Sequence, residues 1–547
     1  MTESALEPPA SAAASDSALA PLRRGGFRAV WSALGGSQLV IWMNTVGAVT
    51  VIASVSDSPT LIALVQTANS VPAVLLALFT GAVADIVDRR RFALGSQLLM
   101  LTAVTGLAAL TLSDAITAPA ALGLTFALGA GMATTVVIYQ TLTPDFVSRT
   151  ELPAAVALNG VAINLARAAG PALAGLVIAV LSAGALFTIE AVLVVLVISI
   201  VFGLRPPDRE PGAAERLAPA MRAGMRFVRF SWPLRTVLVR SGLFSLCASA
   251  LWALLPVVAL HRLDLSSRGF GLLLGCVGAG AIMGATLLPR LRRRVPLDRL
   301  IVGASLGVGA GLVGLAYIPS PMLVGLTVFL TGACWLTVLS SLNTSAQRVA
   351  PGWVRARTLA SYQLVMQGGL ALGSLTWGLV TGGAGVQTAL LVAAGGLAVG
   401  VLGARRWPLS RWEVADLSPA RTWSEPTVEL EPVPSDGPVL VTIEYAVDSQ
   451  DAEDFVAAMD ELGRVRRRDG AHRWNLYEDL EAPGRYLETF VVDSWGEHLR
   501  QHTRLTVADL EVERRAKSLH RGPDPPSVRH LLWAPAALRA GGRSEGR

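Results

Sequence analysis

The chain has 547 residues, of which 52% are apolar and only 16% are charged, and its formal net charge is +6. A charged fraction well below the roughly 25% of soluble domains, together with a mean hydropathy of +0.51, excludes an ordinary soluble protein. The positive charge does not indicate a nucleic-acid partner, because the arginines that supply it cluster beside long apolar segments.

The apolar residues come in segments of the length that crosses a bilayer, about 20 residues. They follow residues 1–26, which are rich in Ala, Ser and Pro and are predicted as a disordered tail, not a signal peptide. The predicted spans are 29–55, 60–84, 92–112, 118–141, 155–180, 184–204, 236–260, 269–289, 299–318, 322–345, 358–381 and 386–404. The expected fold class is an all-α membrane protein whose twelve transmembrane helices form two six-helix halves, 27–204 and 236–404.

The connections between the spans alternate in charge. Arginines follow every second span, at 89–91, 149, 205–235, 290–299, 348–357 and 405–406. The other connections hold no Lys or Arg, except for Arg262 and Arg268 in 261–268. Because arginine-rich connections stay in the cytoplasm, this pattern predicts an even number of spans with both termini cytoplasmic.

The longest of these connections, 205–235, separates the two halves and is predicted as a cytoplasmic linker. Within it, residues 220–230 form a basic amphipathic pattern, in which Ala220 is followed by MRAGMRFVRF. Such a helix is expected to lie on anionic membrane lipid.

The composition changes after residue 404. A linker rich in Pro, Glu and Ser, 405–437, is predicted to lead into a soluble α+β domain, 438–535, and a disordered tail, 536–547. The predicted elements are strand 439–447, helix 452–467, strands 473–478 and 485–492, helix 497–519 and strand 528–533. The order βαββαβ predicts a small ferredoxin-like cytoplasmic domain.

The connection after the second span carries a recognisable motif, GAVADIVDRRR at 81–91. It resembles the loop motif of the major facilitator superfamily, G-x-L-a-D-r-x-G-R-R, but has Ile86 and Asp88 where that motif has Arg and Gly. The resemblance implies a conformational latch formed by the matching residues: Gly81, Asp85, Arg89, Arg90 and Arg91. The alternative is a basic cluster that only sets topology.

The fifth span resembles the antiporter motif of exporters in this superfamily, g-x-x-x-G-P-x-x-G. The residues that carry the likeness are Gly160, Arg167, Gly170, Pro171 and Gly175. The likeness implies export, while the alternative is close packing by small residues.

Two ionisable residues lie well inside the first six spans, where charge is costly. Glu190 is predicted as a proton site, or as a carboxylate that reaches the surface. Arg167 is predicted to bind a substrate anion, or to donate hydrogen bonds to neighbouring carbonyls. Among the polar residues of spans 1 and 2, Asn44, Gln66 and Asn69 are predicted to line a central cavity, with contacts between helices as the alternative.

The soluble segment resembles the dimeric α/β-barrel group. Together with the membrane part, this segment makes the chain resemble the bacterial subgroup that is similar to enterobactin exporters. The resemblance implies that the soluble segment serves in dimerisation or regulation. His498 and His502 lie one helical turn apart, but no third ligand is apparent, so a solvated helix face is expected and no metal or cofactor is predicted.

No nucleotide-binding or hydrolase motif occurs, so the chain is predicted not to be an enzyme. We expect a secondary transporter in the bacterial cytoplasmic membrane that exports a small amphipathic molecule, such as a drug or siderophore, by alternating access, with the proton as coupling ion. Two alternatives stay open: an uptake permease, and a membrane-anchored sensor or scaffold that acts through the soluble domain.

Overall fold

The structure is a computed structural model that describes residues 19–86, 89–148, 150–204, 217–351, 353–406, 408, 418, 420 and 432–533. The chain divides into two compact units. The first comprises the described residues of Met1–Ala214, Arg240–Ser341 and Leu364–Arg406. The second comprises those of Glu215–Val239, Leu342–Gln363 and Trp407–Arg547. The predicted N-terminal tail up to residue 18, most of the 405–437 linker and the C-terminal tail from 534 lie outside the described residues.

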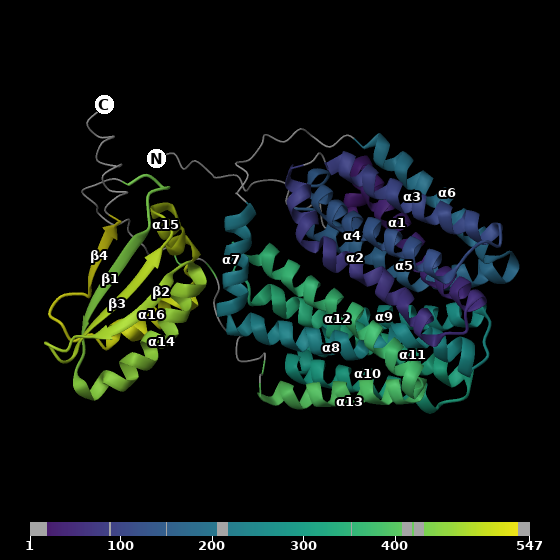
Figure 1. Ribbon diagram of the computed structural model, residues 1–547. Coiled ribbons are helices and arrows are strands. Elements are labelled where there is room, and N and C mark those ends of the chain that lie inside the picture. The colour runs from purple at the N-terminus through teal and green to yellow at the C-terminus, as the bar shows by residue number, and fades with distance from the viewer. Residues whose placement is uncertain are drawn as a thin grey trace, which may run out of the picture. The chain divides into compact units, whose positions relative to one another are not determined.

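Twelve of the described helices are long and apolar enough to cross a membrane, which confirms the predicted number of spans (Figure 1). They are α1 (Gly25–Val55), α2 (Pro59–Ile86), α3 (Arg89–Leu112), α4 (Ala118–Leu142), α5 (Leu152–Val180), α6 (Ala183–Gly203), α8 (Trp232–Val257), α9 (Ser267–Arg294), α10 (Leu297–Tyr317), α11 (Pro321–Arg348), α12 (Arg355–Ala384) and α13 (Val386–Arg406). A π-helical turn, Val258–Arg262, continues α8. Several helices extend a turn beyond the predicted limits, because arginines at their ends keep helical geometry at the edge of the apolar region.

Small residues let these helices approach closely, as is typical of membrane bundles. Gly280 and Gly284 are spaced four apart on α9 and face the backbone of α11. A Cβ added at Gly280 would lie 1.8 Å from the carbonyl oxygen of Phe329, and one at Gly332 would lie 2.1 Å from that of Val277. The α9–α11 contact therefore depends on glycine on both helices.

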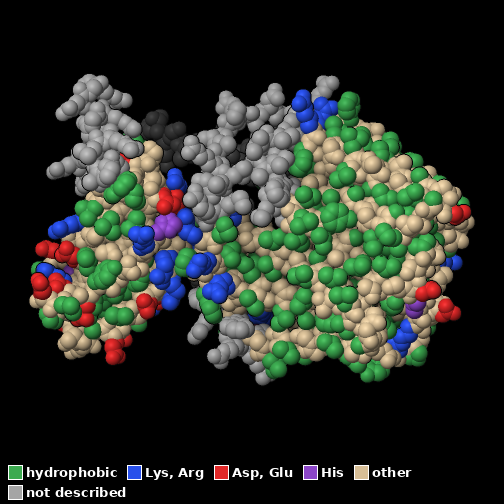
Figure 2. Space-filling view, in the orientation of Figure 1, with side chains coloured by type: hydrophobic (Ala, Val, Ile, Leu, Met, Phe, Trp, Pro, Cys, Tyr) green, Lys and Arg blue, Asp and Glu red, His purple; other side chains and the backbone are tan. Residues whose placement is uncertain are grey.

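The outside of the helical unit is apolar. Figure 2 shows hydrophobic side chains spread over its visible face, with the few charged side chains gathered at its ends. Large exposed residues such as Leu196, Phe202 and Leu379 are more than half exposed. In water such a surface would be unfavourable, but in a bilayer it contacts lipid. The chain is therefore a multi-pass membrane protein.

The second unit contains a four-stranded antiparallel sheet in the order β2-β3-β1-β4 (Figure 1). Its strands are β1 (Val439–Ala446), β2 (His472–Glu478), β3 (Arg485–Val492) and β4 (Ser527–Leu532). Alternate residues of β1 and β3 are buried, as a sheet with one face covered by helices requires. Helices α14 (Ala452–Asp469), α15 (Trp495–Arg504) and α16 (Val507–Ser518) supply the other elements.

One predicted element is wrong. Residues 497–519 were expected to form a single helix, but the chain forms α15 and α16, which break at Leu505 and Thr506. Thr506 is extended, and its side chain and that of Asp509 make reciprocal hydrogen bonds to backbone N–H groups. This capping box starts a new helix and so ends the previous one.

The amphipathic helix is present as α7 (Leu217–Phe230); its predicted contact with lipid stays a prediction, but part of its apolar side is buried against protein. Phe227 is only 1% exposed and packs edge-on against Trp353, with ring centroids 5.9 Å apart. Since both residues belong to the second unit, the helix buries its aromatic side chains against protein.

Candidate functional site

A cation lies against a row of aromatic rings inside the helical unit. The guanidinium of Arg167, on α5, lies 5.2 Å from the ring centroid of Trp42, on α1. Trp42 contacts Trp252, on α8, at 5.7 Å, and Trp252 contacts Trp335, on α11, at 5.5 Å. Phe244 extends the row, 5.3 Å from Trp335. We call these five residues the Arg167–tryptophan cluster. Helices of both the first six and the last six spans contribute to it.

The polar atoms of this cluster are incompletely paired. One Nη of Arg167 donates to the side-chain oxygen of Asn164 at 3.4 Å. Arg167 Nε and Trp42 Nε1 are buried without a hydrogen-bond partner among the described residues. No carboxylate of the described residues forms an ion pair with Arg167. A buried cation without a counter-charge costs stability, which makes it a candidate for function.

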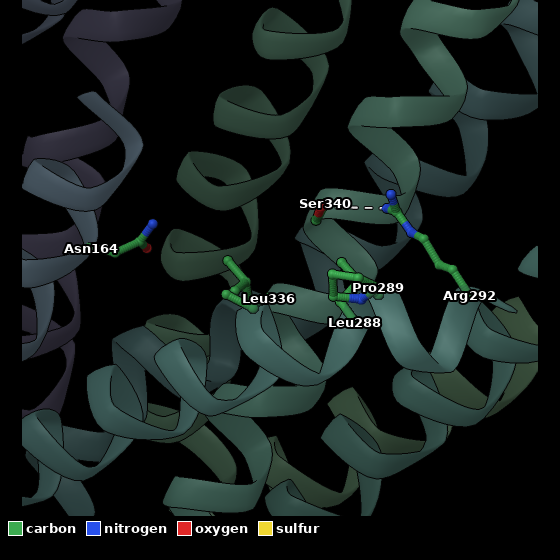
Figure 3. Close-up of a pocket in the computed structure, with 7 residues that line it drawn as sticks. Asn164, Leu288, Pro289, Arg292, Leu336 and Ser340 are labelled. Atoms are coloured by element: carbon green, nitrogen blue, oxygen red, sulfur yellow. Dashed lines mark hydrogen bonds between the residues drawn. The ribbon is translucent and has the colours of Figure 1, made fainter. Parts of the chain in front are cut away.

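A pocket of about 510 Å³ lies among helices α5, α9 and α11 (Figure 3). Its lining residues are Asn164 from α5, Ala285, Leu288, Pro289 and Arg292 from α9, and Leu336 and Ser340 from α11. Asn164 links the pocket to Arg167, and Leu336 follows Trp335 in the chain. The pocket therefore has an apolar wall and several polar groups, as small-molecule sites usually do, and Asn164 connects it to the cluster.

Two of the helices that flank the pocket, α5 and α9, approach each other closely at one end. A Cβ added at Gly278, on α9, would lie 2.5 Å from the Cα of Ala168, on α5. One added at Gly271 would lie 2.6 Å from the carbonyl oxygen of Pro171. Pocket residues occur before Ala168 on α5 and after Gly278 on α9. The pocket thus opens towards the start of α5 and the end of α9, where the arginine-rich connections lie.

A second contact closes the same end. The hydroxyl of Thr60, at the start of α2, donates to the carbonyl of Gly378, near the end of α12, at 3.0 Å. A Cβ at Gly378 would lie 2.9 Å from that of Ala63. Both contacts join the first six helices to the last six beside arginine-poor connections. The first six and the last six helices are therefore in close contact at this end of the helical unit.

Glu190, the predicted proton site, is fully buried on α6. The side-chain amide of Asn44, on α1, donates to its Oε2 at 3.2 Å, and Asn44 is itself 1% exposed. Glu190 Oε1 and Asn44 Oδ1 have no partner among the described residues. Gly47, one turn after Asn44, allows this approach, because a Cβ there would lie 2.7 Å from the ring of Phe187 on α6. Glu190 therefore forms a buried pair with Asn44.

The other predicted residues lie at several places. Gly170 lies where α5 contacts Trp42, since an added Cβ would be 2.7 Å from Trp42 Cβ, and Gly175 lies against α9. Gly160 has open space around it. Gln66 donates to Ser70 within α2 at 3.0 Å. Neither Asn44, Gln66 nor Asn69 is among the described residues that line the pocket.

Only part of the predicted latch is described. The surroundings of Gly81 and the side chains of Asp85 and Arg89 lie outside the described part of the structure. Arg90 donates to the carbonyl of Phe202 at the end of α6, and its guanidinium lies 5.1 Å from the ring of Phe202. This contact joins two of the first six helices.

Sequence reasoning predicted none of the residues that line the pocket, and the charged one among them is Arg292. Arg292 belongs to the run of arginines at 290–299, which reads as a loop that sets topology. In the structure α9 continues to Arg294, and Arg292 donates to Ser340 and Ser341 at 3.4 Å each (Figure 3). If the predicted helix is extended through this run, Arg292 lies one turn after Leu288, on the same face. This spacing is the sequence signal that could have identified Arg292.

The histidines of the soluble segment do not lie on a solvated helix face, contrary to the prediction. His498 is 2% exposed, its Nε2 lies 3.3 Å from that of His502, and its ring lies 4.7 Å from that of His530. Burial, with a smaller contribution from His530, lowers the pKa of His498 to about 4. Burial and the neighbouring His498 lower the pKa of His502 to about 3. Among the described residues, no group of His, Cys, Asp or Glu is placed to hold a metal ion.

These lowered pKa values predict a loss of stability in acid. Because the unfolded chain binds protons near pH 6.5 and the folded chain only near pH 4, the contribution of His498 is present above pH 6.5 and is lost as the pH falls to about 4. It amounts to about 1–3 kcal/mol. We expect His498→Gln to reduce the difference between the thermal unfolding midpoints at pH 7 and pH 5. An unchanged difference would contradict this.

The fold and the pocket define a membrane transporter of the alternating-access class. Residues 16–537 match the MFS_3 family, described as transmembrane secretion effectors, so the chain belongs to this family of the major facilitator superfamily. It is a secondary transporter and not an enzyme. The match includes the soluble segment, which is therefore part of the family's architecture.

Two curated proteins are distant relatives. The chain is 23% identical over 281 residues to the staphyloferrin A transporter of Staphylococcus aureus, covering 50% of this chain and 70% of the relative. It is 26% identical over 341 residues to the multidrug efflux pump Tap of Mycolicibacterium fortuitum, covering 58% of this chain and 79% of that pump.

Solved transporter structures share the fold. A bacterial homologue of the human lysosomal transporter Spinster, in an inward-facing, unoccupied conformation, matches with a TM-score of 0.58 at 13% identity, over 72% of this chain and 99% of the other. The human organic anion transporter MFSD10 matches with a TM-score of 0.51 at 20% identity, over 70% and 99%. At such identities the likeness shows the fold alone.

Proposed function

We propose that the chain is a proton-coupled exporter of a small amphipathic anion. The observation that carries this proposal is the pocket among α5, α9 and α11, whose residue Asn164 accepts a hydrogen bond from Arg167 of the Arg167–tryptophan cluster. In this proposal the structure is the state that accepts the substrate, and rocking of the two six-helix groups transfers it to the other side.

The direction rests on the charge of the connections. Arginine-rich connections stay in the cytoplasm, so the pocket faces the cytoplasm, both termini are cytoplasmic and the membrane is the bacterial inner membrane. A pocket that accepts its substrate from the cytoplasm favours export over uptake. The resemblance of the fifth span to exporters, and the name of the relative Tap as an efflux pump, agree with this direction.

The class of substrate follows from the cluster. Arg167 offers a positive charge with an unpaired Nε, and Trp42 offers an unpaired Nε1 beside it. A carboxylate, sulfonate or phosphate satisfies both donors, and the aromatic rings bind the apolar body of the same molecule. Drugs and siderophores that combine an acidic group with an apolar part fit this description.

The coupling site is the Glu190–Asn44 pair. A charged carboxylate there has one hydrogen bond and is otherwise surrounded by apolar helices. A proton on Glu190 supplies a new O–H donor for the unpaired Asn44 oxygen, which closes a two-way pair between acid and amide. Taking up and releasing this proton is our proposal for how the gradient drives export.

The soluble unit completes the proposal as an accessory domain. Its strand order, β2-β3-β1-β4, together with the βαββαβ order of its elements supports a ferredoxin-like class.

The test is flux through purified protein in proteoliposomes with an imposed pH gradient. Fluorescent aromatic carboxylates and their neutral methyl esters serve as paired substrates. We expect gradient-driven transport of the acids and not of the esters. Flux that ignores the gradient would remove proton coupling, and equal flux of the esters would remove the anion site.

A further inference from the structure

The second unit contains a contact between segments that are far apart in the chain. Arg226 and Phe227 lie on α7, Trp353 lies in the connection between α11 and α12, and Glu497 and Arg504 lie on α15. Arg226 binds Glu497 Oε1 at 2.9 Å, and Arg504 binds the same oxygen at 2.6 Å. The guanidinium of Arg504 lies 4.7 Å from the ring of Trp353, which also contacts Phe227. We call these five residues the clasp.

Neighbouring side chains extend the clasp along α14. The guanidinium of Arg468 lies 5.8 Å from the ring of Phe227, and that of Arg467 lies 5.8 Å from the ring of Phe230. Gly470, with φ +135°, follows α14, and a Cβ there would lie 2.8 Å from Glu497 Oε1. Charged groups of α14 and α15 thus contact α7, and Arg504 of α15 also contacts Trp353 in the α11–α12 connection.

The clasp holds two arginines around one glutamate, and all three side chains are largely buried. Burial alone raises the pKa of the Glu497 carboxyl, but hydrogen bonds and charge from Arg504, Arg500 and Arg226 bring that pKa below its usual value. Glu497 is therefore ionised at neutral pH, when Arg226 and Arg504 need it. Hydrogen bonds between charged groups are stronger than neutral ones, and their strength depends on the position of both partners.

The clasp joins segments that lie directly before two membrane-spanning helices, so it has a consequence for transport. Residue Ser231 alone separates α7 from α8, and Trp353 lies two residues before α12 begins. Alternating access requires the ends of such helices to move. We propose that the clasp makes α7 and the α11–α12 connection parts of the soluble domain, so that both connections move together and the domain sets the rate of the transport cycle.

Hydrogen exchange of the full chain in nanodiscs tests the physical link. We expect Phe227→Ala to increase exchange in residues 349–354, and Trp353→Ala to increase it in α7, although neither change lies in the segment that responds. Glu497→Gln should increase exchange in both segments by about tenfold or more, as the loss of a charged hydrogen bond predicts. The matched control is Arg515→Gln, which removes an exposed pair with Glu461 in the same unit. Responses limited to the changed segment would overturn the proposal.

A measurement of transport distinguishes a regulatory contact from a merely structural one. In proteoliposomes, release of the clasp by Glu497→Gln should change the maximal rate while KM stays constant, because the substrate pocket is unaltered. Unaltered exchange in β1 and β3 verifies that the variant is folded. A variant with increased exchange at α7 and an unchanged maximal rate would overturn the regulatory part. Loss of transport in the wild type itself would contradict the proposed function and not the clasp.

Discussion

Glu190→Gln is expected to abolish gradient-driven export and to leave substrate binding intact. The amide of the variant has the size of the protonated carboxyl, accepts a hydrogen bond from Asn44 and donates one back to Asn44 Oδ1. It therefore imitates the protonated state permanently and removes the group that releases the proton. The rate with a pH gradient should fall to the rate without one. The measurement is flux in proteoliposomes, with binding to the same preparation as a second reading.

The stability of this variant distinguishes coupling from structure. In the charged pair, Glu190 Oε1 and Asn44 Oδ1 have no partner. The variant replaces the first with an N–H group that donates to the second, so the thermal midpoint of Glu190→Gln should equal or exceed that of the wild type. Glu151→Gln is the matched control, since Glu151 forms a more exposed ion pair with Arg24 at 2.7 Å in the same unit. It should transport normally. If Glu190→Gln kept its response to the gradient, the proton would act elsewhere.

Arg167→Gln is expected to weaken binding of the anionic substrate strongly. A charged hydrogen bond in a site shielded from water contributes about 2 kcal/mol or more, which corresponds to an increase in Kd of about thirtyfold or more. Binding is measured through quenching of tryptophan fluorescence, because Trp42, Trp252 and Trp335 surround the site. Arg167→Lys should retain part of the affinity, since it keeps the charge and loses the planar fork.

The same change should stabilise the fold. Arg167 has no carboxylate partner among the described residues, so its removal relieves the cost of a buried charge. Arg240→Gln is the control, because Arg240 binds Asp298 at 2.5 Å and its loss should lower the thermal midpoint without affecting binding. A lower midpoint for Arg167→Gln, with binding preserved, would assign Arg167 a structural role.

Most helices and the four strands could be predicted because their signals are local. The span lengths and the charge of the connections depend on composition, and strand 485–492 alternates buried and half-buried residues along its whole length. The break at Thr506 was missed although its signal is local too, since Thr506 and Asp509 have the spacing of a capping box. No Gly or Pro marks it, so the apolar periodicity appeared continuous.

The site could be predicted only one residue at a time. Glu190 and Arg167 stand out because charge is rare in spans, yet Asn44 and Glu190 are 146 residues apart, and periodicity does not specify which faces of α1 and α6 meet. The partner of α7 was missed for the same reason. A helix with an apolar side is compatible with lipid and with protein, and only the tertiary structure brings Trp353 to Phe227.

The contact between α5 and α9 has a consequence for energetics. Glycine and alanine bring the two backbones together there, and such small residues bury little apolar area. Separating this contact therefore costs less than separating two surfaces of large apolar side chains would. A ligand or a proton can shift the balance between two conformations only by the difference in its affinity for them.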